Sequence, residues 1–350
     1  MLLHRNLLII ILISLSHISY SNPIILKTTK IYSPQKEKFL KNKNIFIKDG
    51  IINNITENNL TGKDNYELFD LSDLFVFPGL IDLHTHLFLN DLTNGTNFGL
   101  TLKHLSKKSK EDRLDMAINR AQQLLKSGFT TLRDLGNSGQ FYDVELKKLI
   151  TKNKLIGPRL FVSGPGICIY PCQYPIDTPK NIITKEYTLI NKNSDMKSII
   201  RKYKSMGVDW IKVYADNHPS KGKIKFELLS NLIKEAKKSG FLVAVHAEED
   251  DTINIALECG ANTIEHGYNL NFSTIEKWTK NPSFFIPTDL SKENYQTLQS
   301  IKPNYYNAND INFWINSRKK RLLKFMLKNS TKFAFGSDLY FNKLTHPNMA

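Results

Sequence analysis

The sequence predicts an α/β protein in which a (β/α)8 TIM-like barrel follows a small N-terminal β-sandwich domain. Two observations predict this fold. From residue 79 onward, short apolar segments alternate with segments of helical period, and several of the helical segments end in glycine. Residues 22–77, by contrast, contain only short segments of strand character.

The first 21 residues have the features of a secretory signal peptide. Arg5 supplies positive charge, Leu7 to Leu15 is an apolar run, and Ser19 and Ser21 are small residues ahead of a cleavage site. The apolar run is too short to cross a bilayer comfortably, so we expect cleavage, with an uncleaved membrane anchor as the alternative. The expected location is therefore secreted or periplasmic, with no stable membrane span after removal of the signal.

The net charge of +15 raises the question of a nucleic-acid partner. The lysines are spread along the chain, and the densest basic runs, Lys107 to Lys110 and Arg318 to Arg321, fall on or beside predicted helices. Aromatic residues that could stack on bases are not interleaved with them. We therefore expect no nucleic-acid binding.

The three cysteines are too few for a disulfide framework. Cys168 and Cys172 could pair in an oxidising compartment, whereas Cys259, just before Gly260, is interpreted as a buried thiol at a helix end. The sequence contains no cysteine-rich metal site.

Residues 22–77 are expected to form the small β domain. Ile24 to Leu26, Ile45 to Ile52 and Phe69 to Phe77 are apolar stretches separated by polar residues. Asp49-Gly50 interrupts the second stretch, and this dipeptide is a strong indication of a tight hairpin between two strands.

Residues 78–350 are expected to form the barrel. A helical period is clear in Glu111 to Ser127 and around Leu228 to Ala236, and glycines 128, 207, 240 and 260 follow predicted helices as C-terminal caps. The eight expected strands are Leu80 to Leu87, Thr130 to Leu135, Arg159 to Gly164, Trp210 to Tyr214, Leu242 to Ala247, Thr263 to His266, Phe284 to Pro287 and Lys332 to Gly336.

Polar side chains stand at the ends of several of these strands. His84 and His86 alternate on the first strand, so they share a face about 7 Å apart, and both could hold one metal ion. The further residues of this kind are Lys212, His246, His266 and Asp338. Each alone could be a hydrogen-bonded core residue. Burial of six such groups without partners at one end of a barrel would cost several kcal/mol of folding free energy, so together they indicate a site rather than six separate core residues.

With these motifs the sequence resembles the amidohydrolase superfamily, in its branch of imidazolonepropionase-like enzymes and prolidase-type (Xaa-Pro or related) dipeptidases. The matching stretches are FPGLIDLHTH at 77–86, GFTTLRD at 128–134, GPRLFVSGPG at 157–166, GVDWIKVY at 207–214, VHAE at 245–248, GANTIEHG at 260–267, Pro287-Thr288 and GSD at 336–338. The resemblance extends over residues 40–348 and implies a metal-dependent barrel joined to a small β domain.

The resemblance also implies a ligand set. His84 and His86 would bind one ion together with Asp338, while His246 and His266 would bind a second. Lys212 would be carbamylated and bridge the two ions; an ordinary lysine beside a single metal is the alternative. Imidazole and carboxylate ligands suit zinc, so one or two zinc or similar divalent ions are implied per chain.

The implied reaction is hydrolysis of a C–N bond in an amide, cyclic amide or dipeptide by a metal-bound hydroxide. Asp338 would be the catalytic residue that takes the proton of the hydroxide and passes it to the leaving nitrogen. The expected partner is a small-molecule or dipeptide substrate, and a homo-oligomer is left open.

Three departures from the family pattern limit this resemblance. The Gly-Gly-His motif that many relatives carry after the third strand is replaced by Cys168 to Pro175, and His246-Ala247-Glu248 stands where many have His-Ala-His. The chain also ends at Ala350, before the segment that completes the β domain in relatives. An alternative is therefore a truncated, inactive barrel that binds metal or a small ligand without catalysis.

Overall fold

The computed structural model describes residues 22–57, 65–89, 98–217, 222–301 and 311–338. The expected signal peptide, residues 1–21, lies outside the described residues. The chain separates into two compact units, Met1–Pro78 and Gly79–Ala350. Among the described residues, no helix has both the length and the apolar character that crossing a membrane requires.

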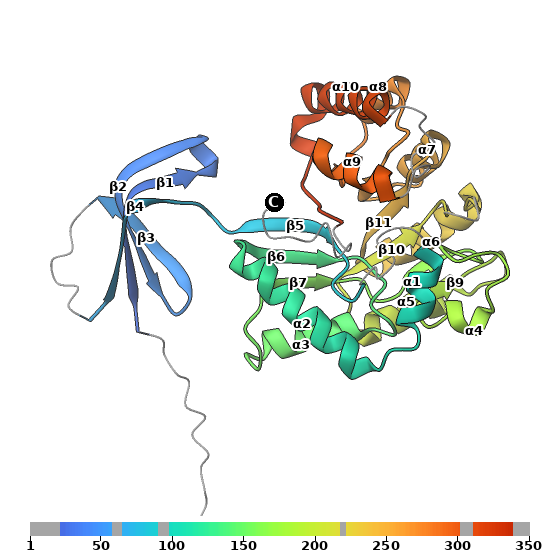
Figure 1. Ribbon diagram of the computed structural model, residues 1–350, viewed down its shortest axis with the longest axis horizontal. Coiled ribbons are helices and arrows are strands. Elements are labelled where there is room, and N and C mark those ends of the chain that lie inside the picture. The colour runs from blue at the N-terminus through green and yellow to red at the C-terminus, as the bar shows by residue number, and fades with distance from the viewer. Residues whose placement is uncertain (1–21, 58–64, 90–97, 218–221, 302–310, 339–350) are drawn as a thin grey trace, which may run out of the picture. The chain divides into compact units, whose positions relative to one another are not determined.

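The first unit contains one four-stranded sheet of order β3-β2-β1-β4, in which β1 and β2 are antiparallel and β1 and β4 are parallel (Figure 1). Asp49 and Gly50 both have positive φ and join β2 to β3, which confirms the predicted hairpin. The elements are β1 (Ile24–Ser33), the one-turn helix η1 (Pro34–Lys36), β2 (Lys38–Lys48), β3 (Ile51–Glu57) and β4 (Glu67–Val76).

The expected β-sandwich is therefore a single sheet in the part of this unit that the structure describes. Ile25, Ile31, Ile45 and Phe46 are its buried apolar residues. The apolar face of these strands predicts that one side of the sheet is covered. It does not tell whether a second sheet or another element covers that side, so the β-sandwich could not be derived from it.

The second unit is an α/β structure built on two parallel sheets. The three-stranded sheet has the order β5-β6-β7 and the six-stranded sheet the order β13-β12-β11-β10-β8-β9. The strands are β5 (Leu80–Thr85), β6 (Phe129–Asp134), β7 (Arg159–Val162), β8 (Gly166–Cys168), β9 (Tyr187–Leu189), β10 (Trp210–Tyr214), β11 (Leu242–Ala247), β12 (Thr263–His266) and β13 (Phe284–Ile286).

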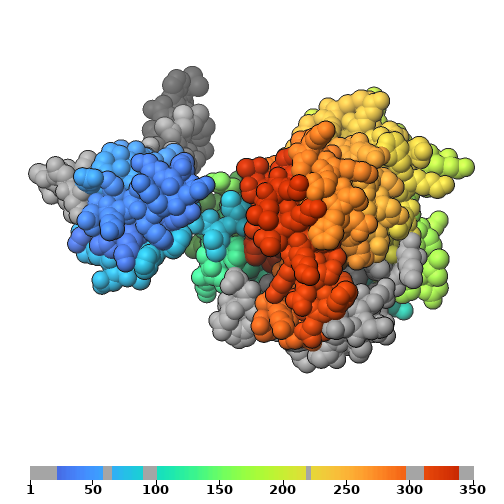
Figure 2. Space-filling model, turned by 90° about the horizontal axis from the view of Figure 1, so that it is seen from above, coloured from blue at the N-terminus to red at the C-terminus, as the bar shows by residue number. Residues whose placement is uncertain are grey.

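Helices alternate with these strands. The two helical segments predicted from their period are confirmed, and glycines 128, 207, 240 and 260 have φ between 80° and 95°, as expected for helix-end caps. The helices are α1 (Phe98–Leu105), α2 (Lys110–Lys126), α3 (Tyr142–Thr151), α4 (Lys180–Ile183), α5 (Met196–Met206), α6 (Phe226–Lys238), α7 (Asp250–Glu258), α8 (Phe272–Trp278), α9 (Lys292–Ile301), α10 (Ile311–Asn329) and η2 (Ser330–Lys332). Figure 2 shows α8 to α10, in orange and red, gathered on one face of this unit.

The prediction of one closed barrel is corrected in two respects. The ladder of strands is interrupted between the two sheets, and the expected eighth strand, Lys332 to Gly336, is extended chain with a single bridge between Phe333 and Phe285. Individual backbone hydrogen bonds still join the sheet edges. Asp209 N donates to Val162 O (2.8 Å), Ala334 N to Phe285 O (3.0 Å) and Leu83 N to Phe335 O (3.1 Å).

Aromatic packing explains the position of the segment after α10. The ring centroids of Trp278, Phe285 and Phe325 lie 4.9–5.2 Å apart, and Phe333 adds its ring at 6.1 Å from Phe285. Burial of these large side chains, with extra gain from their edge-to-face geometry, fixes the start of this segment against β13. The segment then leads directly to Asp338.

Candidate metal centre

The six sequence-predicted residues all belong to the second unit, at or just beyond the C-terminal ends of its strands. Parallel strands bring their carboxyl ends to one edge of a sheet, where loops leave room for a site. His84 is in β5 with His86 just beyond it, Lys212 is in β10, His246 in β11, and His266 ends β12. All five of these side chains are buried, and Asp338 is largely buried.

Three ligand atoms form a close triangle at this edge. His84 Nε2 lies 3.2 Å from His86 Nε2, and Asp338 Oδ1 lies 3.6 Å from the first and 3.3 Å from the second. Ligand atoms about 2.1 Å from a tetrahedral zinc ion are about 3.4 Å from one another. The triangle of His84, His86 and Asp338 therefore has the dimensions of three ligands around one ion.

The other ring nitrogen of each histidine in the triangle has an oxygen partner. His84 Nδ1 lies 2.7 Å from Glu265 Oε2, and His86 Nδ1 donates to Gly136 O at 3.0 Å. Each Nδ1 therefore carries the proton, and the lone pair of each ring is on Nε2, which faces the triangle. A carboxylate or carbonyl partner of this kind sets the tautomer and orientation of metal-binding histidines.

His266 and His246 stand next to the triangle. The His266 ring centroid lies 4.8 Å from that of His84 and 4.4 Å from that of His246, and His266 Nδ1 is 3.7 Å from Asp338 Oδ2. Thr288 Oγ1 donates to Pro287 O and accepts from His266 Nδ1 at 2.8 Å, so the lone pair of His266 is on Nε2. Asp338 Oδ2 therefore faces the protonated side of the His266 ring.

Lys212 is fully buried, and its Nζ has no hydrogen-bond partner among the described residues. A buried ammonium without partners is costly, which is why burial lowers the pKa of Lys212 to about 8, against the opposite effect of Glu265 and Asp338. More of this amine is therefore neutral, and reactive toward carbon dioxide, than of an exposed lysine.

Burial also lowers the pKa of His84 and of His266 well below the ordinary histidine range. Positive charge on Lys212 lowers the pKa of His84 further, and the neighbouring histidine His246 acts in the same direction on His266. Both imidazoles are consequently neutral at pH 7, as coordination to a metal requires.

The close approach of residues 336–338 to β5 places Asp338. A Cβ on Gly336 would lie 2.7 Å from His84 Cβ, so only glycine fits there. Asp82 Oδ1 accepts from the backbone N–H groups of His84 and Ser337, each at 3.0 Å, and Asp338 N donates to His84 O at 2.8 Å. Asp338 also has φ 49°, an uncommon left-handed conformation that these contacts hold in place.

Glu265 is a further residue of this cluster that was not predicted from the sequence. It is fully buried, and its Oε1 accepts from Arg133 Nη2 at 2.9 Å while Oε2 faces His84. The available indication was a charged residue inside an otherwise apolar predicted strand, at the position before His266. Glu248, at the position of the second histidine of the family's His-Ala-His, is partly buried, and its Oε1 lies 3.5 Å from His246 Nε2.

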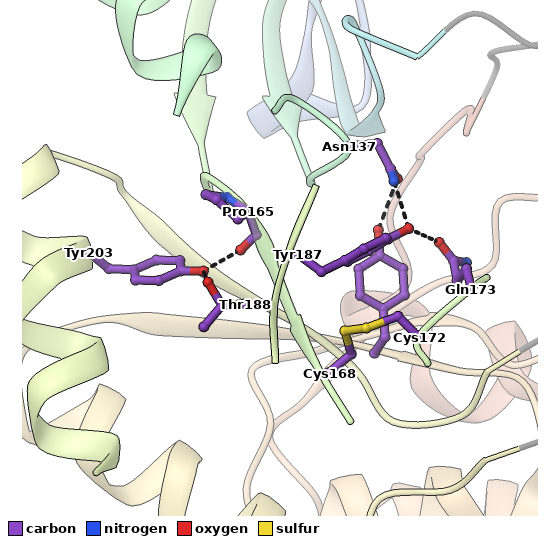
Figure 3. Close-up of a disulfide and its surroundings, with 9 residues drawn as sticks. Asn137, Pro165, Cys168, Cys172, Gln173, Tyr187, Thr188 and Tyr203 are labelled. Atoms are coloured by element: carbon purple, nitrogen blue, oxygen red, sulfur yellow. Dashed lines mark hydrogen bonds between the residues drawn. A yellow bond between two sulfur atoms is a disulfide. The ribbon is translucent and has the colours of Figure 1, made fainter. Parts of the chain in front are cut away.

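The loop that replaces the Gly-Gly-His motif is closed by a disulfide between Cys168 and Cys172, the pairing that the sequence allowed (Figure 3). Both cysteines are fully buried. Cys259, expected to be a buried thiol, is half-buried at the end of α7.

Comparison with known proteins finds a family model, curated relatives and solved structures that are similar to this chain. A model of the amidohydrolase family matches residues 75–349. Curated relatives include the imidazolonepropionases of Bacillus velezensis, 25% identical over 243 residues (61% of this chain and 54% of the relative), and of Fusobacterium nucleatum, 24% identical over 221 residues (57% and 51%). The chain thus spans about half the length of these curated relatives.

Solved structures share the fold at lower identity. A Xaa-Pro dipeptidase with bound methionine has a TM-score of 0.73 at 21% identity, over 91% of this chain and 80% of that chain. A prolidase complexed with N-methylphosphonate-L-proline has a TM-score of 0.74 at 19% identity (91% and 79%). The ochratoxinase of A. niger has a TM-score of 0.72 at 18% identity (91% and 76%). The fold of these neighbours supports a TIM-like arrangement for the two parallel sheets.

Glu265→Gln is expected to weaken metal binding about 10- to 100-fold, because the amide is a poorer partner for His84 Nδ1 than the carboxylate. Competition with a chromophoric chelator measures the affinity, and Glu258→Gln, at an exposed position, is the control. Because Gln also leaves Arg133 without its charge partner, Glu265→Asp is the second variant, which keeps the charge but shortens the reach to His84. Unchanged affinity in both folded variants would contradict this role.

Proposed function

Since this chain belongs to the amidohydrolase family, we propose that it is a metal-dependent hydrolase that cleaves a carbon–nitrogen bond in a small molecule or dipeptide. The observation that carries the proposal is the triangle of His84, His86 and Asp338, whose ligand atoms have the spacing of a metal site. The centre is further proposed to hold two divalent ions, with zinc the first candidate because imidazoles and carboxylates suit it.

The donor types present would suit two ions. His84, His86 and Asp338 would hold the first, and His246 and His266 the second. A carbamate on Lys212 would turn a buried, unpartnered cation into an anion with two oxygens, one for each ion, which removes the cost of burying that ammonium. This fit supports carbamylation over an ordinary lysine beside a single metal.

Divalent ions bound at this position would lower the pKa of a water molecule and polarise the carbonyl group of the bond to be cleaved. The chain itself supplies the proton transfer. Asp338 has one oxygen within 3.6 Å of both His84 and His86 Nε2 and the other 3.7 Å from His266 Nδ1, so its carboxylate is at the centre of the cluster. We assign it the role of base toward the nucleophile and then of acid toward the leaving nitrogen.

The substrate class is a proposal as well. Structural neighbours named as a Xaa-Pro dipeptidase and a prolidase support a dipeptide, and the curated relatives named imidazolonepropionase support a small cyclic amide. Export would favour the dipeptide, because peptides are available outside the cytoplasm. The loop at 168–175 differs from the family motif, so the substrate preference is expected to be this protein's own.

Metal loading tests the centre directly. Wild-type protein purified without chelator and reconstituted with zinc and bicarbonate is expected to bind about two ions per chain, because a carbamate can bridge them. Lys212→Met is expected to bind about one ion, and Lys234→Met, at an exposed position, to match the wild type. Elemental analysis gives the counts, and the ¹³C NMR signal of a carbamate from labelled bicarbonate identifies the modification.

One ion in the wild type regardless of bicarbonate would contradict the binuclear centre. Essentially no ion in a folded chain would remove the enzyme proposal and favour the inactive alternative.

Asp338→Asn is expected to lower kcat by about 10²- to 10⁴-fold, because the amide cannot take up the proton. Release of free amine from a panel of dipeptides and cyclic amides measures the reaction, with Asp115→Asn as an exposed control. A variant that retained both its ions and full activity would refute the role of Asp338.

We also propose that the protein is exported. The signal-like first 21 residues and the disulfide between Cys168 and Cys172 support this, because disulfides persist in oxidising compartments. The intact mass of the chain recovered from outside the cytoplasm is expected to correspond to a start at Asn22. A mass that includes residues 1–21 would instead indicate an uncleaved anchor.

A further inference from the structure

The disulfide-closed loop is joined to the metal centre by a line of hydrogen-bonded side chains. Gln173 directly follows Cys172, and its Oε1 accepts from the hydroxyl of Tyr187 at 2.6 Å. Asn137 Nδ2 donates to the same Tyr187 hydroxyl at 2.7 Å. Figure 3 shows Gln173, Tyr187 and Asn137 in line beside the disulfide.

The line ends at Tyr214. Its hydroxyl lies 3.2 Å from Asn137 Oδ1, with Leu135 O as a second acceptor at 3.4 Å. The aromatic ring of Tyr214 lies against the His246 ring, with centroids 5.2 Å apart, and Lys212 Nζ is 4.9 Å from the centroid of the same ring. Tyr214 therefore lies next to His246, a proposed ligand of the second ion, and next to Lys212, the proposed bridge between the two ions.

The surroundings make each link specific. Asn137, Tyr187 and Tyr214 are at most 2% exposed, so water cannot easily replace a lost partner. The backbone of Asn137 is held separately, because its carbonyl accepts from Arg113 Nη2 at 2.7 Å. What Tyr187 and Tyr214 decide is therefore the orientation of the Asn137 amide.

We propose that Tyr187 is a positioning residue for the second half of the metal centre, with the disulfide-closed loop setting its hydroxyl through Gln173. Loss of the Tyr187 hydroxyl leaves the Asn137 amide nitrogen without its acceptor in a buried place. The amide then reorients, the Tyr214 hydroxyl loses a partner, and the ring that supports His246 and Lys212 is less fixed. This inference rests on the proposed binuclear function and assigns a role to a loop that departs from the family motif.

The test compares two buried tyrosines in the same protein. Tyr187→Phe removes only the hydroxyl that belongs to the line. Tyr203→Phe is the matched control, because the Tyr203 hydroxyl is equally buried, donates to Pro165 O (2.6 Å) and accepts from Thr188 Oγ1 (2.8 Å), while its ring packs on Phe141. Figure 3 shows the two tyrosines with their hydrogen-bond partners.

Tyr187→Phe is expected to weaken binding of the second zinc ion about tenfold and to reduce the carbamate ¹³C signal, with a smaller effect on the first ion, because its ligands His84, His86 and Asp338 stay in place. Tyr203→Phe is expected to leave both zinc affinities at wild-type values. Equilibrium zinc titration in bicarbonate buffer, with melting temperatures of the metal-free proteins, separates lost positioning from lost stability. The proposal would be overturned in favour of a merely structural role if Tyr187→Phe lowered the affinities for both zinc ions equally. The same conclusion would follow if Tyr203→Phe lowered the affinity for the second ion as much as Tyr187→Phe.

Gln173 supplies a rescue pair. Gln173→Met removes the acceptor at similar volume and is expected to lower the affinity for the second ion as Tyr187→Phe does. Gln173→Glu keeps an oxygen acceptor and is expected to bind the second ion with wild-type affinity. If the wild type binds two ions and neither Tyr187→Phe nor Gln173→Met weakens the second, the positioning role is wrong and the binuclear centre stands. If the wild type binds no second ion, both proposals are wrong.

Discussion

The geometry of the candidate metal centre depends on the contacts of the buried Glu265 carboxylate with Arg133 and His84. The carboxylate lies between a guanidinium, that of Arg133, and an imidazole, that of His84, and all three side chains are almost completely removed from water. A buried charge is tolerated only when it is paired and hydrogen-bonded, so each member constrains the other two. The constraint fixes the His84 ring with Nε2 toward His86 and Asp338, and it joins β12, β6 and β5 at their C-terminal ends.

A second constraint acts through the segment that leads to Asp338. Residues 334 and 335 bond to β13 on one side and β5 on the other, and they do so without forming a regular strand. His266, Thr288 and Asp338 all have positive φ, an uncommon conformation for residues other than glycine. Such strain persists where the surrounding contacts are strong, and at His266 and Asp338 it coincides with proposed ligands, as is typical of functional sites.

Much of the second unit could be predicted from local pattern. The bounds of β10, β11 and β12 agree with the expected segments, and the cap glycines have the expected φ, because strand period and helix ends depend on neighbouring residues. The predictions of a regular eighth strand and of a β-sandwich were wrong. Both depend on which surfaces meet, and the apolar content of Phe333 to Phe335 or of β4 is the same whether a regular ladder forms or not.

The sequence by itself determined which residue types reach the carboxyl ends of the strands, since alternation and strand order place His84, His86, His246 and His266 there. It also contained the Cys168 and Cys172 pair and the motifs of the amidohydrolase family. Only the tertiary structure decided that Glu265 contacts His84, that Lys212 Nζ has no hydrogen bond among the described residues and that Tyr187 is linked to Tyr214 through Asn137. These facts depend on distances between residues far apart in the chain, which side-chain packing sets and local periodicity does not contain.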